Sequence, residues 1–154
     1  MKGKNNFVSE NSYDTNGRLF STETTKNSQT ITEDYGFDTF GRVTSRTNDR
    51  SGVTAYSYYQ NNTTGSHCRN KLQSIQITPA LTDNDSGYTD SDSATQTYTY
   101  TYDEKGDEAS VEYTEGNYSM EVAFTRDAYG RYNGQAFLDR KFPPKSVSRY
   151  SYER

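Results

Sequence analysis

Apolar and polar side chains alternate along much of the chain. Residues 97–102 read Thr-Tyr-Thr-Tyr-Thr-Tyr, and residues 31–37 and 118–124 place mostly aliphatic or aromatic side chains at every second position. A period of two puts successive side chains on opposite faces of an extended strand. The pattern predicts an all-β fold of roughly ten or eleven antiparallel strands of ~6–8 residues each. No segment has the period or the caps of a helix.

A five-residue motif interrupts the alternation and recurs along the chain. It begins with Asp, has Gly in fourth place and in its best copies ends with Arg; the first two copies lie 24 residues apart, as do the last two. The copies occupy residues 14–18, 38–42, 62–66, 103–107 and 127–131. The third copy is degenerate and keeps little beyond Gly65. A repeat of this period predicts one supersecondary unit per copy, here a β-hairpin.

The residue types suit a tight chain reversal. An Asp that opens a turn accepts hydrogen bonds from backbone N–H groups just ahead of it, and Gly adopts positive φ without strain. A type I turn followed by a left-handed glycine forms a bulge that matches the twist of the flanking strands. The first and fifth residues then face each other, which predicts the pairs Asp14–Arg18, Asp38–Arg42 and Asp127–Arg131.

The fourth copy departs from this rule. It places Asp103 opposite Asp107. Like charges directly across a strand pair are destabilising. We therefore expect this hairpin to be weaker than the others, or bent away from their geometry.

The chain is expected to form a single domain over residues 1–154, with one insertion. The third and fourth copies lie 41 residues apart (103 minus 62), which exceeds one period by 17. The excess corresponds to residues 79–95, which are rich in Asp, Ser and Thr and predict a loop. Further turns are expected near residues 26–29, 48–52, 114–117 and 142–145.

Composition limits the alternatives. Ile, Leu, Val and Phe make up only 20 of 154 residues, a fraction that indicates disorder when net charge is high. Here the net charge is −4, and 15 tyrosines supply apolar surface in place of the aliphatics. No apolar run is long enough for a membrane-spanning helix.

Charge and cysteine content exclude further classes of partner. The acidic balance, with a pI near 5.0, provides no electrostatic footprint for nucleic acid. The single cysteine, Cys68, can form no intrachain disulfide. No signal peptide is visible at the N-terminus of this chain, which lacks an apolar segment there.

Residues 13–19 and 37–43 resemble the YD repeat of the Rhs family, in which an aromatic residue precedes Asp, two variable residues, Gly, Arg and an aliphatic residue. The resemblance extends over about residues 10–154. Four positions of the later copies depart from it: Asp107 stands in place of Arg and Glu108 in place of the aliphatic residue, then Arg126 in place of Tyr and Tyr132 in place of the aliphatic residue. The residues that carry the structural turn motif are Tyr13, Asp14, Gly17, Arg18, Phe37, Asp38, Gly41, Arg42, Gly65, Tyr102, Asp103, Gly106, Asp127, Gly130 and Arg131.

The resemblance implies a twisted, curved, open sheet that forms a fragment of a YD-repeat shell. In the family, hairpins join edge to edge into a hollow shell that encloses a toxic segment in bacterial polymorphic and insecticidal toxins. Wall-associated proteins and animal teneurins carry related shells. The implied role is a non-catalytic scaffold, secreted or at the cell surface, whose partners are the remainder of a longer chain and a toxin cargo. Residues 150–154 look like the opening of a further copy. Exposed edge strands would also favour self-association.

No enzyme chemistry is predicted, and no cofactor. His67, the only histidine, is adjacent to Cys68, and neighbours on a strand point to opposite faces. The acidic insertion resembles half a calcium loop. Its Gly87 comes one place early and Ala94 stands where Glu is needed, so a solvated loop without metal is the better interpretation. The calcium ligands would be Asp83, Asp85, Asp90 and Asp92.

The alternative function is a binding module for a glycan or a surface protein. Aromatic rings on one sheet face could stack on sugar rings, or they could be the apolar side of a sheet that lacks aliphatic residues. The candidate ligand face consists of Tyr56, Tyr58, Tyr98, Tyr100 and Tyr102.

Overall fold

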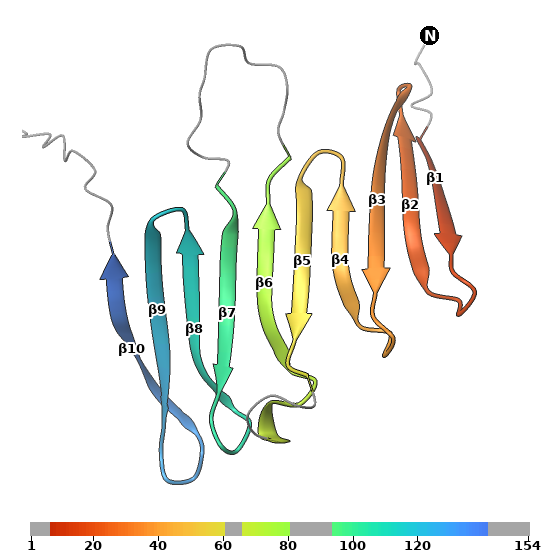
Figure 1. The fold of residues 1–154 in the computed structure, drawn as a ribbon. Coiled ribbons are helices and arrows are strands. Elements are labelled where there is room, and N and C mark those ends of the chain that lie inside the picture. Colours follow the sequence, from red (N-terminus) through yellow and green to blue (C-terminus); the bar gives the residue numbers. More distant parts are fainter. Residues whose placement is uncertain (1–6, 61–65, 81–93, 142–154) are drawn as a thin grey trace, which may run out of the picture.

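The computed structural model describes residues 7–60, 66–80 and 94–141. These residues form one ten-stranded antiparallel sheet in which the strands follow in sequence order (Figure 1). The predicted all-β fold of antiparallel hairpins is thereby confirmed. The strands are β1 (Phe7–Tyr13), β2 (Leu19–Lys26), β3 (Gln29–Phe37), β4 (Val43–Asn48), β5 (Gly52–Tyr58), β6 (Leu72–Thr78), β7 (Gln96–Tyr102), β8 (Glu108–Glu115), β9 (Tyr118–Arg126) and β10 (Tyr132–Lys141).

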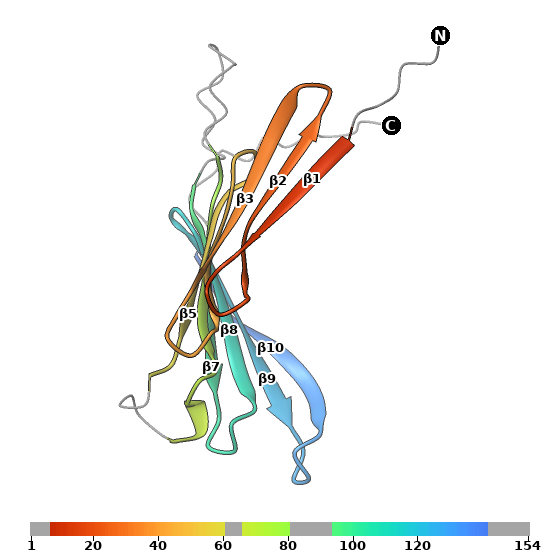
Figure 2. The ribbon, with the colours of Figure 1, turned by 90° about the vertical axis from the view of Figure 1, so that its right-hand side faces the viewer.

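The sheet is open and uncurled, and the direction of its strands turns steadily from β1 to β10 (Figure 2). Such twist is the normal right-handed twist of strands, accumulated over neighbours. Strands β1 and β10 lie at opposite edges of the described sheet, where each has one neighbouring strand. Every residue of β1 is exposed.

Two kinds of connection lie at the two ends of the sheet. The motif turns lie at one end, and the register shifts by a bulge where each incoming strand meets them, as between Ser12 and Tyr13 or between Gly36 and Phe37. At the other end, β2 and β3 are joined by Asn27 and Ser28, which both have positive φ. That geometry is the type I′ turn favoured by hairpin twist. β6 ends and β7 begins at this same end (Figure 1), and residues 79–95 separate the two strands in the sequence.

The two faces of the sheet differ in chemistry. On one face, Tyr56, Ile75, Tyr98, Tyr113 and Met120 lie opposite one another on successive strands from β5 to β9. We call this the aromatic face.

On the other face, hydroxyls pair across strands: Ser57 with Ser74 at 2.7 Å between their Oγ atoms, and Thr101 with Ser110 at 2.8 Å. Among the described residues, Cys68 is the only buried hydrophobic side chain, so no conventional core is present. The sheet is therefore stabilised by contacts between neighbouring strands, as in other repeat proteins.

One helical turn interrupts the strands. Residues Ser66–Cys68 form a 3₁₀ helix in the connection between β5 and β6. Within the described ranges, no helix is long and apolar enough to cross a membrane.

Candidate functional site

The motif turns share one hydrogen-bonding scheme. In the first turn, the Asp14 carboxylate accepts bonds from the backbone N–H groups of Asn16 (2.8 Å) and Arg18 (2.9 Å) and from Arg18 Nε (2.7 Å). The backbone of Gly17, at φ 76°, donates to the Asp14 carbonyl at 2.9 Å. The turns at 38–42 and 127–131 repeat these bonds. The predicted pairs of first and fifth residues thus lie in contact.

These hydrogen bonds lower the pKa values of the turn aspartates. The backbone N–H of Arg18 is the main cause of a lowered pKa of Asp14, and the backbone of Arg131 has the same effect at Asp127. At Asp38, burial raises the pKa, but the bonds from Arg42 outweigh it. The turn aspartates are therefore held in their ionised form.

The fourth turn keeps this geometry despite its like charges. The Asp103 carboxylate accepts from the backbone of Lys105 and of Asp107, both at 2.9 Å, and Gly106 has φ 86°. The expectation of a bent turn was wrong, because the Asp carboxylate is held by backbone N–H groups that any fifth residue supplies. The Asp107 carboxylate lies instead 3.9 Å from Nε of Arg126.

Residues 62–66 were predicted to form the third turn, and the connection between β5 and β6 is closed by bonds outside that range. Gly65 and most of that copy lie outside the described residues, and the closing bonds involve other residues. Tyr59 N–H donates to the Lys71 carbonyl (2.9 Å), and Asn70 N–H donates to the Tyr59 carbonyl (3.2 Å). Asn70 has φ 63°.

Tyr59, Asn70 and Lys71 therefore take the positions that Asp, Gly and Arg hold in the other turns. Ten further residues separate Tyr59 from Asn70 in the sequence, and the 3₁₀ helix lies among them. Asparagine tolerates the left-handed backbone better than other residues that have a Cβ. This turn could have been found only by matching the strands on either side of it.

The basic residue of each turn reaches the aromatic residue that precedes the next turn. The Arg18 guanidinium lies 4.6 Å from the centre of the Phe37 ring, and that of Arg42 lies 4.3 Å from the Tyr58 ring. Lys71 Nζ lies 4.7 Å from the Tyr102 ring. These distances are those of cation–π contacts. We call each contact a rung, and the series of rungs the turn ladder.

Strand register explains the ladder. Ser21 is paired with Asp34, and three further residues along each strand bring Arg18 opposite Phe37. The same extrapolation places Arg42 opposite Tyr58, Lys71 opposite Tyr102, and Asp107 opposite Arg126.

Hydrogen bonds reinforce the rungs in both directions. Arg42 donates to Asn70 Oδ1 at 3.2 Å, and Lys71 donates to the Gly106 carbonyl, so each cation also binds the next turn. The Tyr58 hydroxyl donates back to the Val43 carbonyl at 2.8 Å. Tyr102 likewise donates to the carbonyl of Leu72, at 2.9 Å. Each rung therefore joins two hairpins that are separate in sequence.

The fourth rung has its charge reversed. The position of the basic residue holds Asp107, and the position of the aromatic residue holds Arg126. Arg126 also donates to the Glu108 carbonyl at 3.2 Å. Two of the departures of the later copies from the repeat pattern, Asp107 and Arg126, thus compensate each other across one rung.

The tyrosines of the candidate ligand face belong to the aromatic face and are all half-buried. Tyr58 and Tyr102 are part of the rungs. The Tyr98 ring lies 5.1 Å from the Tyr113 ring, and Tyr100 offers its carbonyl to the Tyr59 hydroxyl at 2.8 Å. Burial raises the pKa of Tyr100, as it does for Tyr58 and Tyr102.

One further polar cluster lies on the same face. The Glu33 carboxylate accepts from Arg46 (2.6 Å), from Asn48 (3.2 Å) and from the Tyr35 hydroxyl. The bond from Arg46 is the main cause that lowers the pKa of Glu33 to about 2. Such a carboxylate is a poor proton acceptor. A shallow hollow beside it is lined by Thr22, Thr24, Ile31, Glu33 and Asn48.

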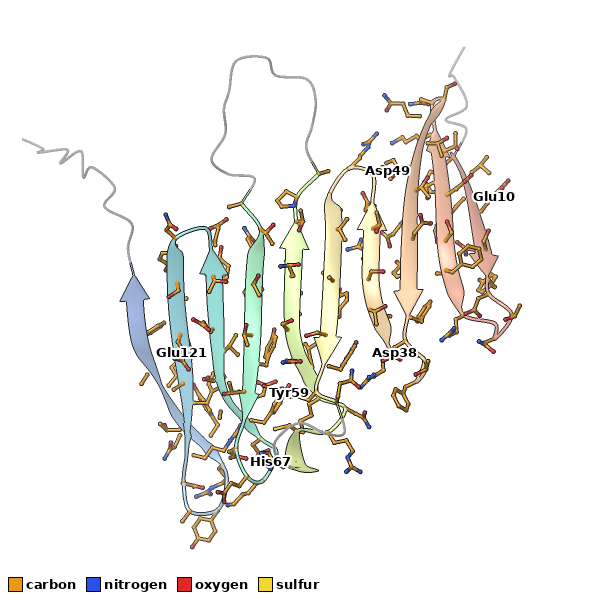
Figure 3. The ribbon with its side chains drawn as sticks, viewed as in Figure 1. Glu10, Asp38, Asp49, Tyr59, His67 and Glu121 are labelled. Carbon is orange, nitrogen blue, oxygen red and sulfur yellow. The ribbon has the colours of Figure 1, made fainter. Side chains whose placement is uncertain are left out.

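His67 and Cys68 lie on the 3₁₀ helix and not on a strand. The argument that neighbouring strand residues point to opposite faces therefore does not apply to them. Figure 3 shows His67 near Tyr59 at the end of the sheet where Asp38 and the other motif turns lie. Within the described part of the chain, no three His, Cys, Asp or Glu side chains come together as metal ligands. The calcium candidates Asp83, Asp85, Asp90 and Asp92 lie outside the described residues.

Comparison with known proteins gives a likeness of fold. No family model matches the chain, and no curated protein does. Among solved structures, a crystal structure of TcdB2-TccC3-Cdc42 superposes with a TM-score of 0.60 at 20% identity, over 82% of this chain and 7% of that one. A Tc holotoxin pore of Photorhabdus luminescens with mutated TccC3 gives a TM-score of 0.56 at 20% identity, over 85% of this chain and 7% of that one.

The chain is thus similar in fold to a small part of Tc toxin proteins, and it spans 7% of the length of those chains. At this identity, the likeness concerns the arrangement of strands.

Proposed function

We propose that the chain is a non-catalytic scaffold, a segment of the wall of an extracellular YD-repeat shell that encloses a toxin or presents a cell surface. The turn ladder carries this proposal. Each rung fastens one hairpin to the next, and the residues that the motif supplies are used in those contacts. The fold likeness to Tc toxin proteins supports the same role.

A wall of this kind needs no core. A single sheet that has neighbour contacts only can be lengthened by further hairpins without rearrangement of those already present. The ladder keeps the motif turns in register along one end of the sheet, so that the strands remain aligned as the wall grows. The charged residues near the turns serve this alignment. Glu33 has a pKa of about 2, which suits a structural ion pair and does not suit proton transfer.

The rival is a binding module for a glycan or a surface protein, whose ligand face would consist of Tyr56, Tyr58, Tyr98, Tyr100 and Tyr102. The two functions differ in what Tyr100→Ala does. For a scaffold, removal of this half-buried ring lowers the free energy of unfolding by about 1–2 kcal/mol. For a binder, the same change causes the same loss of stability, because the ring is half-buried in either case, and it also removes glycan binding.

The test combines a glycan array with urea unfolding, applied to the wild type and to Tyr100→Ala. Tyr129→Ala is the matched control, because Tyr129 is 85% exposed at the tip of a turn. We expect no glycan signal from the wild type and a stability loss in Tyr100→Ala that the control does not share. A saturable glycan signal that Tyr100→Ala abolishes would replace the scaffold by the binder.

A further inference from the structure

Within residues 7–60, 66–80 and 94–141, the turn ladder is incomplete at both edges of the sheet. At the β1 edge, Tyr13 holds the aromatic position of a rung, yet it is 58% exposed and no cation covers it among the described residues. At the β10 edge, Arg131 holds the basic position, and its side chain is 75% exposed. In the completed rungs, the side chains of Arg18 and Arg42 are 32% and 17% exposed.

Arg131 is nevertheless positioned as the rung arginines are. Its guanidinium is bound to Asp127 at 2.7 Å and lies 5.3 Å from the Tyr129 ring. Arg42 has the same arrangement, with Asp38 at 2.6 Å and the Phe40 ring at 5.1 Å, and in addition covers Tyr58. Arg131 thus has one of the two rings that Arg42 has.

Strand directions make the two edges complementary. β10 leaves a motif turn and β1 enters one, as β2 and β3 do in the first completed rung. If β1 of a second copy is placed antiparallel beside β10, with the motif turns at the same end, Arg131 faces Tyr13. The exposed backbone groups of both edge strands then form a ladder of hydrogen bonds.

We propose that this chain associates head to tail with a second copy of itself, with β10 of one copy against β1 of the next and Arg131 stacked on Tyr13 of the neighbour. The joint is heterologous, so it leaves a free edge at each end and can add further copies. The copies continue the meander as one sheet. This inference does not depend on the proposed function. If copies do not associate, the chain can still be a scaffold whose edge strands pair with hairpins of the same polypeptide.

The charge-reversed fourth rung supplies the design of the experiment. Tyr13→Arg places two arginines at the joint, and Arg131→Asp removes the cation, so each variant alone should associate about tenfold more weakly than the wild type. In an equimolar mixture, one joint is Arg131 against Tyr13, and the other pairs the introduced arginine with the introduced aspartate. Mixing should therefore restore association.

Sedimentation velocity over a range of concentrations measures the joint, and circular dichroism checks that each variant keeps its strands. Tyr13→Phe keeps the ring and should associate as the wild type does. Arg69→Asp is the matched charge control, because Arg69 is exposed at the same end of the sheet but away from the edges. A wild type that stays monomeric at every concentration overturns the proposal. So does self-association that Tyr13→Arg leaves unchanged, or a mixture that fails to reassemble.

Discussion

Replacement of both residues of the fourth rung tests whether the ladder stabilises the fold. Asp107→Arg combined with Arg126→Tyr converts this rung into the arginine-on-aromatic form of Arg42 and Tyr58. Either single variant leaves a mismatch, since Asp107→Arg sets two arginines opposite each other and Arg126→Tyr leaves a carboxylate facing a ring. Only the double variant restores a matched pair.

The contacts set the magnitude. The native pair is 3.9 Å apart, with the Arg126 and Asp107 side chains 25% and 48% exposed, so it contributes less than about 1 kcal/mol. The new rung should contribute about 1 kcal/mol, as a partly desolvated cation–π contact does. The double variant also removes the repulsion between the two arginines of the single variant. We therefore expect a coupling energy of about 2 kcal/mol in favour of the double variant.

Urea unfolding of the wild type, both single variants and the double variant gives this coupling energy directly. All four proteins are measured at one low concentration, because self-association shifts apparent stability. Any new contact between the introduced arginine and Asp103 occurs in a single variant and in the double variant alike, and it cancels. The control cycle pairs Asp107→Arg with Arg131→Tyr, whose positions are not opposed, and should give no coupling. Coupling in the test cycle below about 0.5 kcal/mol would refute the ladder as a source of stability.

Three further changes probe the turns and the aromatic face. Gly41→Val puts a β-branched residue at φ 82° and should destabilise the protein by about 2 kcal/mol in urea unfolding, whereas Gly41→Asn should cost less; equal losses would contradict the turn geometry. Because the Glu33 pKa is lowered from 4.5 to about 2, its stabilising effect is complete above pH 4.5 and is lost as the pH falls toward 2. Glu33→Gln should flatten the stability profile over that interval. Burial, with the bond to Glu115, raises the pKa of Tyr113 to about 12, so its contribution is complete below pH 10 and is lost as the pH rises toward 12. In an ultraviolet titration, Tyr113→Phe should lose absorbance change from the part of the curve near pH 12.

Turn chemistry made much of the fold predictable. In the four turns that open with Asp, the bonds join residues at most four positions apart, as between Asp14 and Arg18, so the local sequence contains all that these turns require. The alternation along 97–102 likewise places three tyrosines on one face of β7 without reference to any other strand.

The third turn shows where such reasoning stops. Its first residue is Tyr59 and its left-handed residue is Asn70, so the spacing of the motif is lost although the bonds that close the turn remain. The prediction rested on Gly65, a glycine at the expected interval, which lies outside the described residues. Only the pairing of β5 with β6 identifies the residues that close this turn.

The sequence by itself determined the local features of the protein, which are the period of the strands, the hairpin turns and the resemblance to a repeat. The tertiary structure alone decided which turn residues meet. Lys71 reaches Tyr102, and Asp107 compensates Arg126, because strand register brings separate hairpins together. A contact between neighbouring strands depends on the register of both, and the register depends on the length of every connection between them. For this reason Asp107 and Arg126, each of which departs from the repeat pattern, form a matched pair in the folded sheet.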